Sequence, residues 1–283
     1  MTGKPAYQRL LRRDRPITLA GLAALCALAW LYVITGAGLG MNAWDMTTLA
    51  LFPHQHAADM AAAMPGMDMG TAEPPPWRPA NWALIVAMWW IMMIAMMSPS
   101  AAPTILLYAR VHRHALAEGR NQAGLAPTGA FAAGYLLVWL GFSVGAALLH
   151  WLLERAGIVS AMAMGSQSRW LSAAILIAAG FYQLSPLKHA CLAHCRAPAS
   201  FLARHWRPRA VGALRLGAMH GAFCVGCCWM LMALLFVGGV MNLVWIAALA
   251  FLVLIEKLLP PGIWVGRAAG VALILWGIAT ILV

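Results

Sequence analysis

The chain has 283 residues, of which 63% are hydrophobic and only 10% are charged. A soluble domain carries roughly a quarter of charged residues, so the composition excludes an ordinary soluble enzyme. The net charge of +11 reflects Lys and Arg that gather in alternate loops, as in membrane proteins, and nothing else favours nucleic-acid binding. The apolar residues form blocks of about twenty, the length of a helix that crosses a bilayer. We therefore predict an all-α, polytopic membrane protein.

The N-terminal part divides into three segments. Residues 1–16 are basic, and we expect them to be cytoplasmic. The apolar run 17–39 is longer than the core of a secretory signal and is predicted to be an uncleaved first transmembrane helix. Residues 40–80 are rich in His, Met and Pro and are expected to form an outer loop. The remaining residues, 81–283, are predicted to form a six-helix membrane domain.

The spans expected in this domain are 81–108, 129–152, 170–187, 212–238, 241–257 and 263–282. As one helix, the apolar run 212–257 would be about 70 Å long, more than twice the thickness of the hydrocarbon core. It must therefore turn, and Gly238-Gly239 and Asn242 mark the place. About seven spans, with a cytoplasmic N-terminus and a periplasmic C-terminus, agree with the charge bias of the loops. We expect the protein in a bacterial inner membrane.

Four soft metal donors lie inside the predicted span 212–238: His220, Cys224, Cys227 and Cys228. A helix turns about 100° per residue, so the first three share one stripe and Cys228 flanks it. Thiolates suit Cu(I), zinc or an iron–sulfur cluster. A lone Cys in such a helix is usually a packing residue, but this spacing favours a metal site. Gly217 and Gly221 have the spacing of a close helix–helix contact.

The predicted span 81–108 is rich in methionine, with five residues in ten: Met88, Met92, Met93, Met96 and Met97. A thioether is neutral and soft, so it can bind Cu(I) without carrying charge into lipid. The last four are the candidate ligands, and the alternative is that they only fill space in the core. The midpoints of this span and of span 212–238 both fall near the membrane midplane. We therefore expect a shared site, with Cys224 or Cys227 close to Met92 or Met96.

Two further groups of donors lie outside the predicted spans. Cys191, His194 and Cys195 place three ligands within five residues of an inner loop, 188–211, and the alternative is a pair of unreactive loop cysteines. Glu256-Lys257 are expected in the next inner loop. The outer loop combines imidazoles and thioethers that could capture copper, the alternative being a disordered polar loop. These outer donors are His54, His56, Met64, Met67 and Met69.

Several of these motifs together resemble a bacterial family of predicted metal-binding integral membrane proteins, catalogued as a domain of unknown function. The resemblance covers roughly residues 80–260. It implies an all-helical membrane fold and metal binding, without a named metal or reaction. The residues that carry it are Met92-Met93-Ile-Ala-Met96-Met97-Ser98-Pro99, Tyr182 to Lys188, Cys191 to Arg196, Gly217 to Gly221, Cys224 to Trp229, Gly239 to Asn242 and Glu256-Lys257.

The favoured interpretation is a protein that handles Cu(I), by transport, transfer or delivery to a metalloenzyme, and that is not an enzyme. Zinc and iron are the alternative metals. The expected partners are the metal ion, membrane lipids and a copper chaperone or copper enzyme, and an oligomer is compatible with the sequence. The first rival is a membrane thiol–disulfide oxidoreductase that relays electrons between Cys pairs. The second is a helical assembly factor or scaffold.

Overall fold

The computed structural model describes residues 4–38, 42–44, 46–47, 78–117, 126–160, 164–207 and 209–283. These residues form helices, together with one isolated bridge between Val159 and Ser166. The all-α prediction is confirmed. The helices are α1 (Lys4–Ile34), α3 (Pro79–Ala117), α4 (Ala126–Arg155), α5 (Arg169–Leu184), α6 (Pro186–Arg196), α7 (Pro198–His205), α8 (Arg209–Ala233), α9 (Leu235–Gly238), α10 (Leu243–Leu258) and α11 (Gly262–Leu282).

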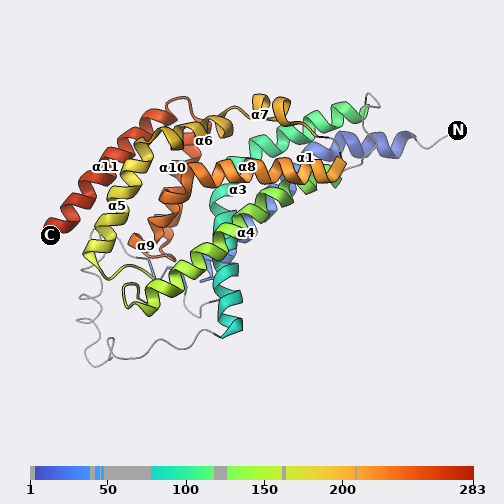
Figure 1. The fold of residues 1–283 in the computed structure, drawn as a ribbon. Helices are drawn as coiled ribbons and strands as arrows, with labels where there is room; N and C mark the ends of the chain where they lie inside the picture. Colours follow the sequence, from blue (N-terminus) through green and yellow to red (C-terminus); the bar gives the residue numbers. More distant parts are fainter. Residues whose placement is uncertain are drawn as a thin grey trace.

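The helices are arranged as two pairs with α3 and α10 between them (Figure 1). Helix α4 packs along α8, and α5 packs along α11. Helix α3 packs on α1, α4 and α10, while the short helices α6 and α7 run across one end of the bundle. Helix α6 also packs on α8, so the segment that follows α5 reaches the helix that carries three cysteines.

Glycines allow the closest of these contacts. A Cβ atom at Gly217 of α8 would lie 1.9 Å from the carbonyl oxygen of Phe131 in α4, and one at Gly134 would lie 2.0 Å from that of Leu214. A Cβ atom at Gly221 would lie 3.1 Å from the carbonyl oxygen of Tyr135. Small residues on both helices thus let the backbones touch, which confirms the packing role predicted for Gly217 and Gly221.

Five described helices are long and apolar enough to cross a membrane. They contain the segments Pro16–Ile34, Pro79–Ala115, Pro127–Arg155, Arg209–Gly238 and Gly262–Leu282. Helices α5 and α6 add a sixth if the pair, which is bent by 62°, is one span. Helix α10, which we expected to span, has only 16 residues. The number of seven spans and the orientation of the termini stay predictions.

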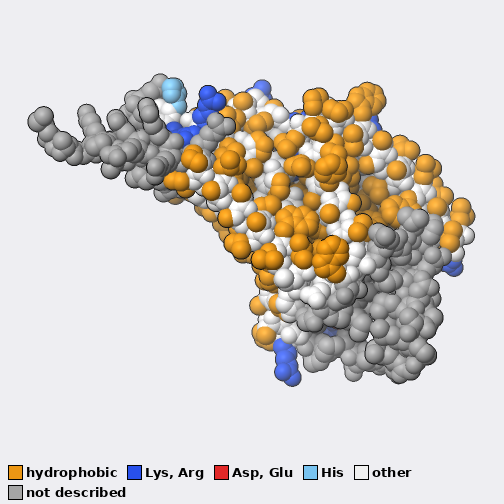
Figure 2. All heavy atoms as spheres, turned by 180° about the vertical axis from the view of Figure 1, so that it is seen from behind, with side chains coloured by type: hydrophobic (Ala, Val, Ile, Leu, Met, Phe, Trp, Pro, Cys, Tyr) orange, Lys and Arg blue, Asp and Glu red, His pale blue; other side chains and the backbone are white. Residues whose placement is uncertain are grey.

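The outer surface of the bundle is largely apolar. Figure 2 shows hydrophobic side chains spread over one face, with Lys and Arg at its margins. Large apolar side chains of α10 and α11 are more than half exposed, including Phe251, Trp264 and Leu275. Water would solvate such a surface poorly, so it is compatible with a surrounding bilayer.

The turn expected near Asn242 is confirmed. Gly239 has a φ of +92°, which a residue with a side chain rarely adopts, and it ends α9. Asn242 then caps α10, because its side chain accepts hydrogen bonds from the backbone N–H groups of Val244 and Trp245.

Two expectations about loops were wrong. The segment 188–211 is not a loop, because its residues belong mainly to α6, α7 and the start of α8. Ser185 caps α6 and Pro186 occupies its first turn, so the Ser-Pro pair begins a new helix here. Glu256 and Lys257 do not lie in a loop either, since they form the last turn of α10 and are buried.

Candidate metal site

The three cysteines of α8 are buried in the middle of the bundle. Cys224, Cys227 and Cys228 are each at most 2% exposed. The thiols of Cys227 and Cys228 both donate hydrogen bonds to the carbonyl oxygen of Cys224, over 3.1 and 2.8 Å. The spacing of these cysteines therefore turns their sulfur atoms toward one short stretch of the helix. All three are free thiols, as a site for a soft metal ion requires.

One methionine of α3 reaches this cluster. The Met97 Sδ atom lies 3.9 Å from the Cys228 Sγ atom, and both side chains are at most 1% exposed. The expected pair was Cys224 or Cys227 with Met92 or Met96. The contact found instead joins the next residue along each helix, and the expected pair stays a prediction. Helices α3 and α8 are not close packing partners along the described chain, since α8 packs mainly on α4 and α6. The contact is made by the long Met97 side chain.

The other four methionines singled out in α3 are also buried. Their side chains are at most 1% exposed within the core cluster that includes the cysteines: Met88, Met92, Met93 and Met96. Met97 stands apart from them because it contacts a thiol. A direct ligand role for Met92, Met93 and Met96 stays a prediction.

Lys257 and Tyr135 complete the surroundings of Cys224, although neither was among the predicted site residues. The Lys257 Nζ atom lies 2.9 Å from the Cys224 Sγ atom, and the Tyr135 hydroxyl lies 3.1 Å from it. Lys257 also donates to the Ser100 hydroxyl over 3.3 Å, and Tyr135 donates to the carbonyl oxygen of Met97 over 3.3 Å. A charged residue in an apolar run was the signal for Lys257. Tyr135 has no comparable signal in the sequence.

The cysteines predicted to lie in a loop instead face α8 from α6. Cys195 interacts with Cys227 through their thiols. Cys191 lies over Gly226, where an added Cβ atom would be only 2.9 Å from its sulfur. The Tyr182 hydroxyl donates to the carbonyl oxygen of Gly226 and fixes this approach from α5. The two predicted cysteine groups, about thirty residues apart in sequence, thus form one cluster.

The two predicted histidine ligands have different surroundings. His194 stacks on Phe223, with ring centroids 4.1 Å apart, and its Nδ1 atom pairs with the carbonyl oxygen of Ala190 at 2.9 Å. His220 is buried among aromatic rings, and its centroid lies 5.6 Å from that of Phe201. Its Nδ1 atom has no hydrogen-bond partner within the described part of the molecule.

A second polar cluster lies beside the thiols. Glu256 forms a buried ion pair with Lys188, with 2.6 Å between the carboxylate oxygen and the amine. Gln183 hydrogen-bonds both members of this pair. Arg196 donates to the backbone carbonyl oxygens of Glu256 and Pro260. These contacts join α5, α6 and α10 and so fix the position of α6, which in turn packs on α8.

The described residues contain no group of three His, Cys, Asp or Glu side chains that is already arranged around a metal ion. Cu(I) can use soft sulfur donors that such a group would not include, namely thioethers. The pair of Cys228 and Met97, with Cys224 adjacent, offers that kind of donor set.

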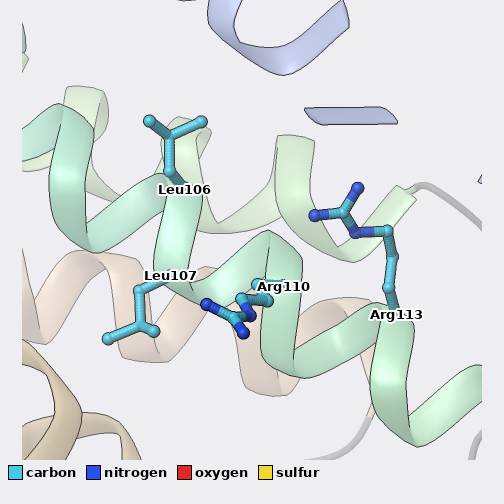
Figure 3. Close-up of a pocket in the computed structure, with 4 residues that line it drawn as sticks. All are labelled: Leu106, Leu107, Arg110 and Arg113. Atoms are coloured by element: carbon cyan, nitrogen blue, oxygen red, sulfur yellow. The ribbon is translucent and has the colours of Figure 1, made fainter. Parts of the chain in front are cut away.

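Two other regions do not contribute to this cluster. The outer-loop donors His54, His56, Met64, Met67 and Met69 lie outside the described residues. A surface cavity of about 470 Å³ is lined by two leucines and two arginines of α3, Leu106, Leu107, Arg110 and Arg113 (Figure 3). Its lining contains no soft donor, so it is not a copper site.

Fold and site together define a class of protein: an all-helical bundle, with membrane-compatible helices, that buries a cluster of soft sulfur donors. Residues 86–280 match the model of the family PpoB2, described as a copper chaperone. The chain therefore belongs to the PpoB2 copper chaperone family. The resemblance noted in the sequence had named no metal, and the family match indicates copper. Neither a curated protein nor a solved structure matches the chain.

Proposed function

We propose that this protein is a membrane protein that binds Cu(I) in its sulfur cluster and passes it on, by transport or by delivery to a copper enzyme. The contact between Cys228 and Met97 carries this proposal. It joins a thiol to a thioether at a buried position, and these are the donors that favour Cu(I) over harder ions. Binding and release of a metal ion need no catalysis, so we propose a carrier and not an enzyme.

The arrangement of the thiols suggests a route. Cys195 and Cys191 on α6 lie at the side of the cluster that is partly exposed, whereas Cys224 and Cys228 lie deeper. Copper would move between Cys195 and Cys227 by exchange of one thiolate ligand for another. The imidazoles and thioethers of segment 40–80, which lie outside the described residues, would supply or receive copper. Because thiols lose protons when they bind a metal, affinity should fall at low pH.

We further propose that the protein is embedded in the inner membrane of a bacterium. Five long apolar helices and the exposed apolar side chains of α10 and α11 support this location. A cytoplasmic N-terminus follows from the basic residues of segment 1–16. The α6 cysteines would then lie on the cytoplasmic side.

Metal analysis of purified protein tests the copper site. The wild type, purified without chelators, is expected to contain Cu(I), and a Cys227→Ser/Cys228→Ser variant is expected to lose most of it. Cys26→Ser is the matched control, because this thiol of α1 lies outside the cluster and donates to the carbonyl oxygen of Ala95, 3.8 Å away. If the double variant keeps the copper content of the wild type, the buried site is wrong.

A thiol–disulfide oxidoreductase is the second candidate, because Cys195 and Cys227 interact across two helices. Exchange of a disulfide between them would relay electrons without any metal. This function predicts a mixed disulfide with a partner under metal-free conditions. Thiol labelling that does not change with redox potential would exclude it. It leaves the contact of Met97 with Cys228 unexplained.

A further inference from the structure

We infer that Lys257 makes the buried sulfur site selective for monovalent over divalent metal ions. This inference rests on the proposed copper function and adds a specificity-determining residue to it. Lys257 is 6% exposed, and its amine lies 2.9 Å from the Cys224 sulfur and 3.3 Å from the Ser100 hydroxyl. It does not belong to the adjacent ion pair, in which Glu256 is joined to Lys188.

The inference follows from the charges left after a metal has bound. When Cys224 and Cys228 bind a metal ion, each thiol releases one proton and becomes a thiolate. With Cu(I) they form a complex of charge −1, and the Met97 thioether adds none. The Lys257 ammonium cancels this charge. The same two thiolates around Zn(II) are already neutral, so Lys257 would leave an excess of +1 in the core.

Net charge matters here because the site is closed to water. Cys224, Cys228 and Met97 are each at most 1% exposed, and an uncompensated charge is costly at such a place. Within the described part of the chain, the other charged groups beside the site do not supply a counter-charge. Glu256 and Lys188 neutralise each other, and Arg196 binds the carbonyl oxygens at the end of α10. Lys257 therefore sets the charge that the bound metal must complement.

The test compares affinities for Cu(I) and Zn(II) in the full-length, detergent-purified protein, with competing chelators under reducing, oxygen-free conditions. Lys257→Met is expected to lower the preference for Cu(I) over Zn(II) at least tenfold, which corresponds to about 1.4 kcal/mol. Lys257→Arg keeps the positive charge and should keep the preference. Ser100→Ala is the matched control, because it removes the other contact of Lys257 and leaves the charge in place. Ag(I) should follow Cu(I) in every variant.

A double variant separates charge from structure. Lys257→Met combined with Cys224→Ser removes one positive charge and one thiolate. Cu(I) held by Cys228 and Met97 is then neutral again, so the preference for Cu(I) over Zn(II) should return even though a ligand is lost. A purely structural role of Lys257 predicts no such return. Lys257→Gln serves in place of Lys257→Met if that variant does not fold.

Several results would overturn the inference. It is wrong if Lys257→Met binds both metals with the preference of the wild type, or loses both affinities by the same factor. It is also wrong if the double variant fails to regain the preference. A wild type that binds no Cu(I) would refute the proposed function itself, and with it the inference. The wild-type measurement therefore distinguishes the two failures.

Discussion

Glu256 and Lys257 are neighbours at the end of α10, yet they enter two different polar clusters. Glu256 meets Lys188 and Gln183, so each charge and amide has a partner. Lys257 instead meets the Cys224 thiol and the Ser100 hydroxyl, which are neutral unless the thiol loses its proton. The charges of the first cluster balance one another. In the second cluster, thiols can lose their protons and the resulting thiolates can bind a further cation.

This difference separates a structural from a functional use of buried charge. A closed ion pair contributes little net stability, but it fixes which elements lie together, and removal of one partner is costly. Here it fixes α6 against α10. The cysteines of the thiol cluster form no disulfide, so their sulfur atoms can still bind and release an ion.

The largest effect is expected when one partner of the buried ion pair between Lys188 and Glu256 is removed. Lys188→Met leaves Glu256 buried without its partner, which should lower the free energy of unfolding by about 3–5 kcal/mol. Thermal unfolding of the purified protein measures this. Lys188→Met combined with Glu256→Gln removes both charges and should recover most of the loss. If the single variant is as stable as the wild type, the pair does not hold α6 in place.

A smaller effect is expected where α8 touches α4. Gly217→Ala would place a methyl group 1.9 Å from the Phe131 carbonyl oxygen, so the helices must separate, at a cost of about 1–3 kcal/mol. The separation would also draw Cys224 from Tyr135, and copper affinity should fall. Gly141→Ala on α4 is the control, because an added Cβ atom there meets nothing within 4 Å. Equal stability of both variants would contradict the close packing.

Replacing the Met97 thioether tests the metal site without disturbing the fold. Met97→Leu keeps an apolar side chain of similar size but removes the sulfur next to Cys228, so Cu(I) affinity should fall about tenfold, or 1.4 kcal/mol. Chelator competition measures the change. Met88→Leu is the control, since Met88 is equally buried but lies more than two helical turns away. Equal affinities of the two variants would show that Met97 is only a packing residue.

The smallest effect is expected at the contact of α6 with α8. Gly226→Ala would bring a methyl group to 2.9 Å from the Cys191 sulfur, the end of a side chain that can move aside at a cost of about 1 kcal/mol, the low end for overpacking. Stability and copper content should therefore hardly change, while alkylation of Cys191 should become faster. Gly129→Ala, with nothing within 4 Å of the added atom, is the control. Unchanged alkylation would show that Cys191 does not rest on Gly226.

The sequence predicted the helices of the core well, because apolar block length and glycine spacing are local properties. Gly217 and Gly221 proved to lie at a helix contact, and Asn242 proved to begin a helix. Segment 188–211 was mistaken for a loop, because its basic residues masked two short helices that begin at prolines. The copper prediction agrees with the family match, whereas the outer-loop donors lie outside the described residues.

The amino-acid sequence is enough to show that the chain is helical, largely apolar and equipped with soft donors in separate segments. Which of these donors meet depends on how the helices pack. Cys195 meets Cys227, and Cys228 meets Met97, because α6 packs on α8 and the long Met97 side chain extends from α3 to α8. Helix packing also brings the Lys257 amine to 2.9 Å from the Cys224 sulfur. Helical periodicity fixes the face on which a residue lies, but the packing of distant helices fixes what that face contacts.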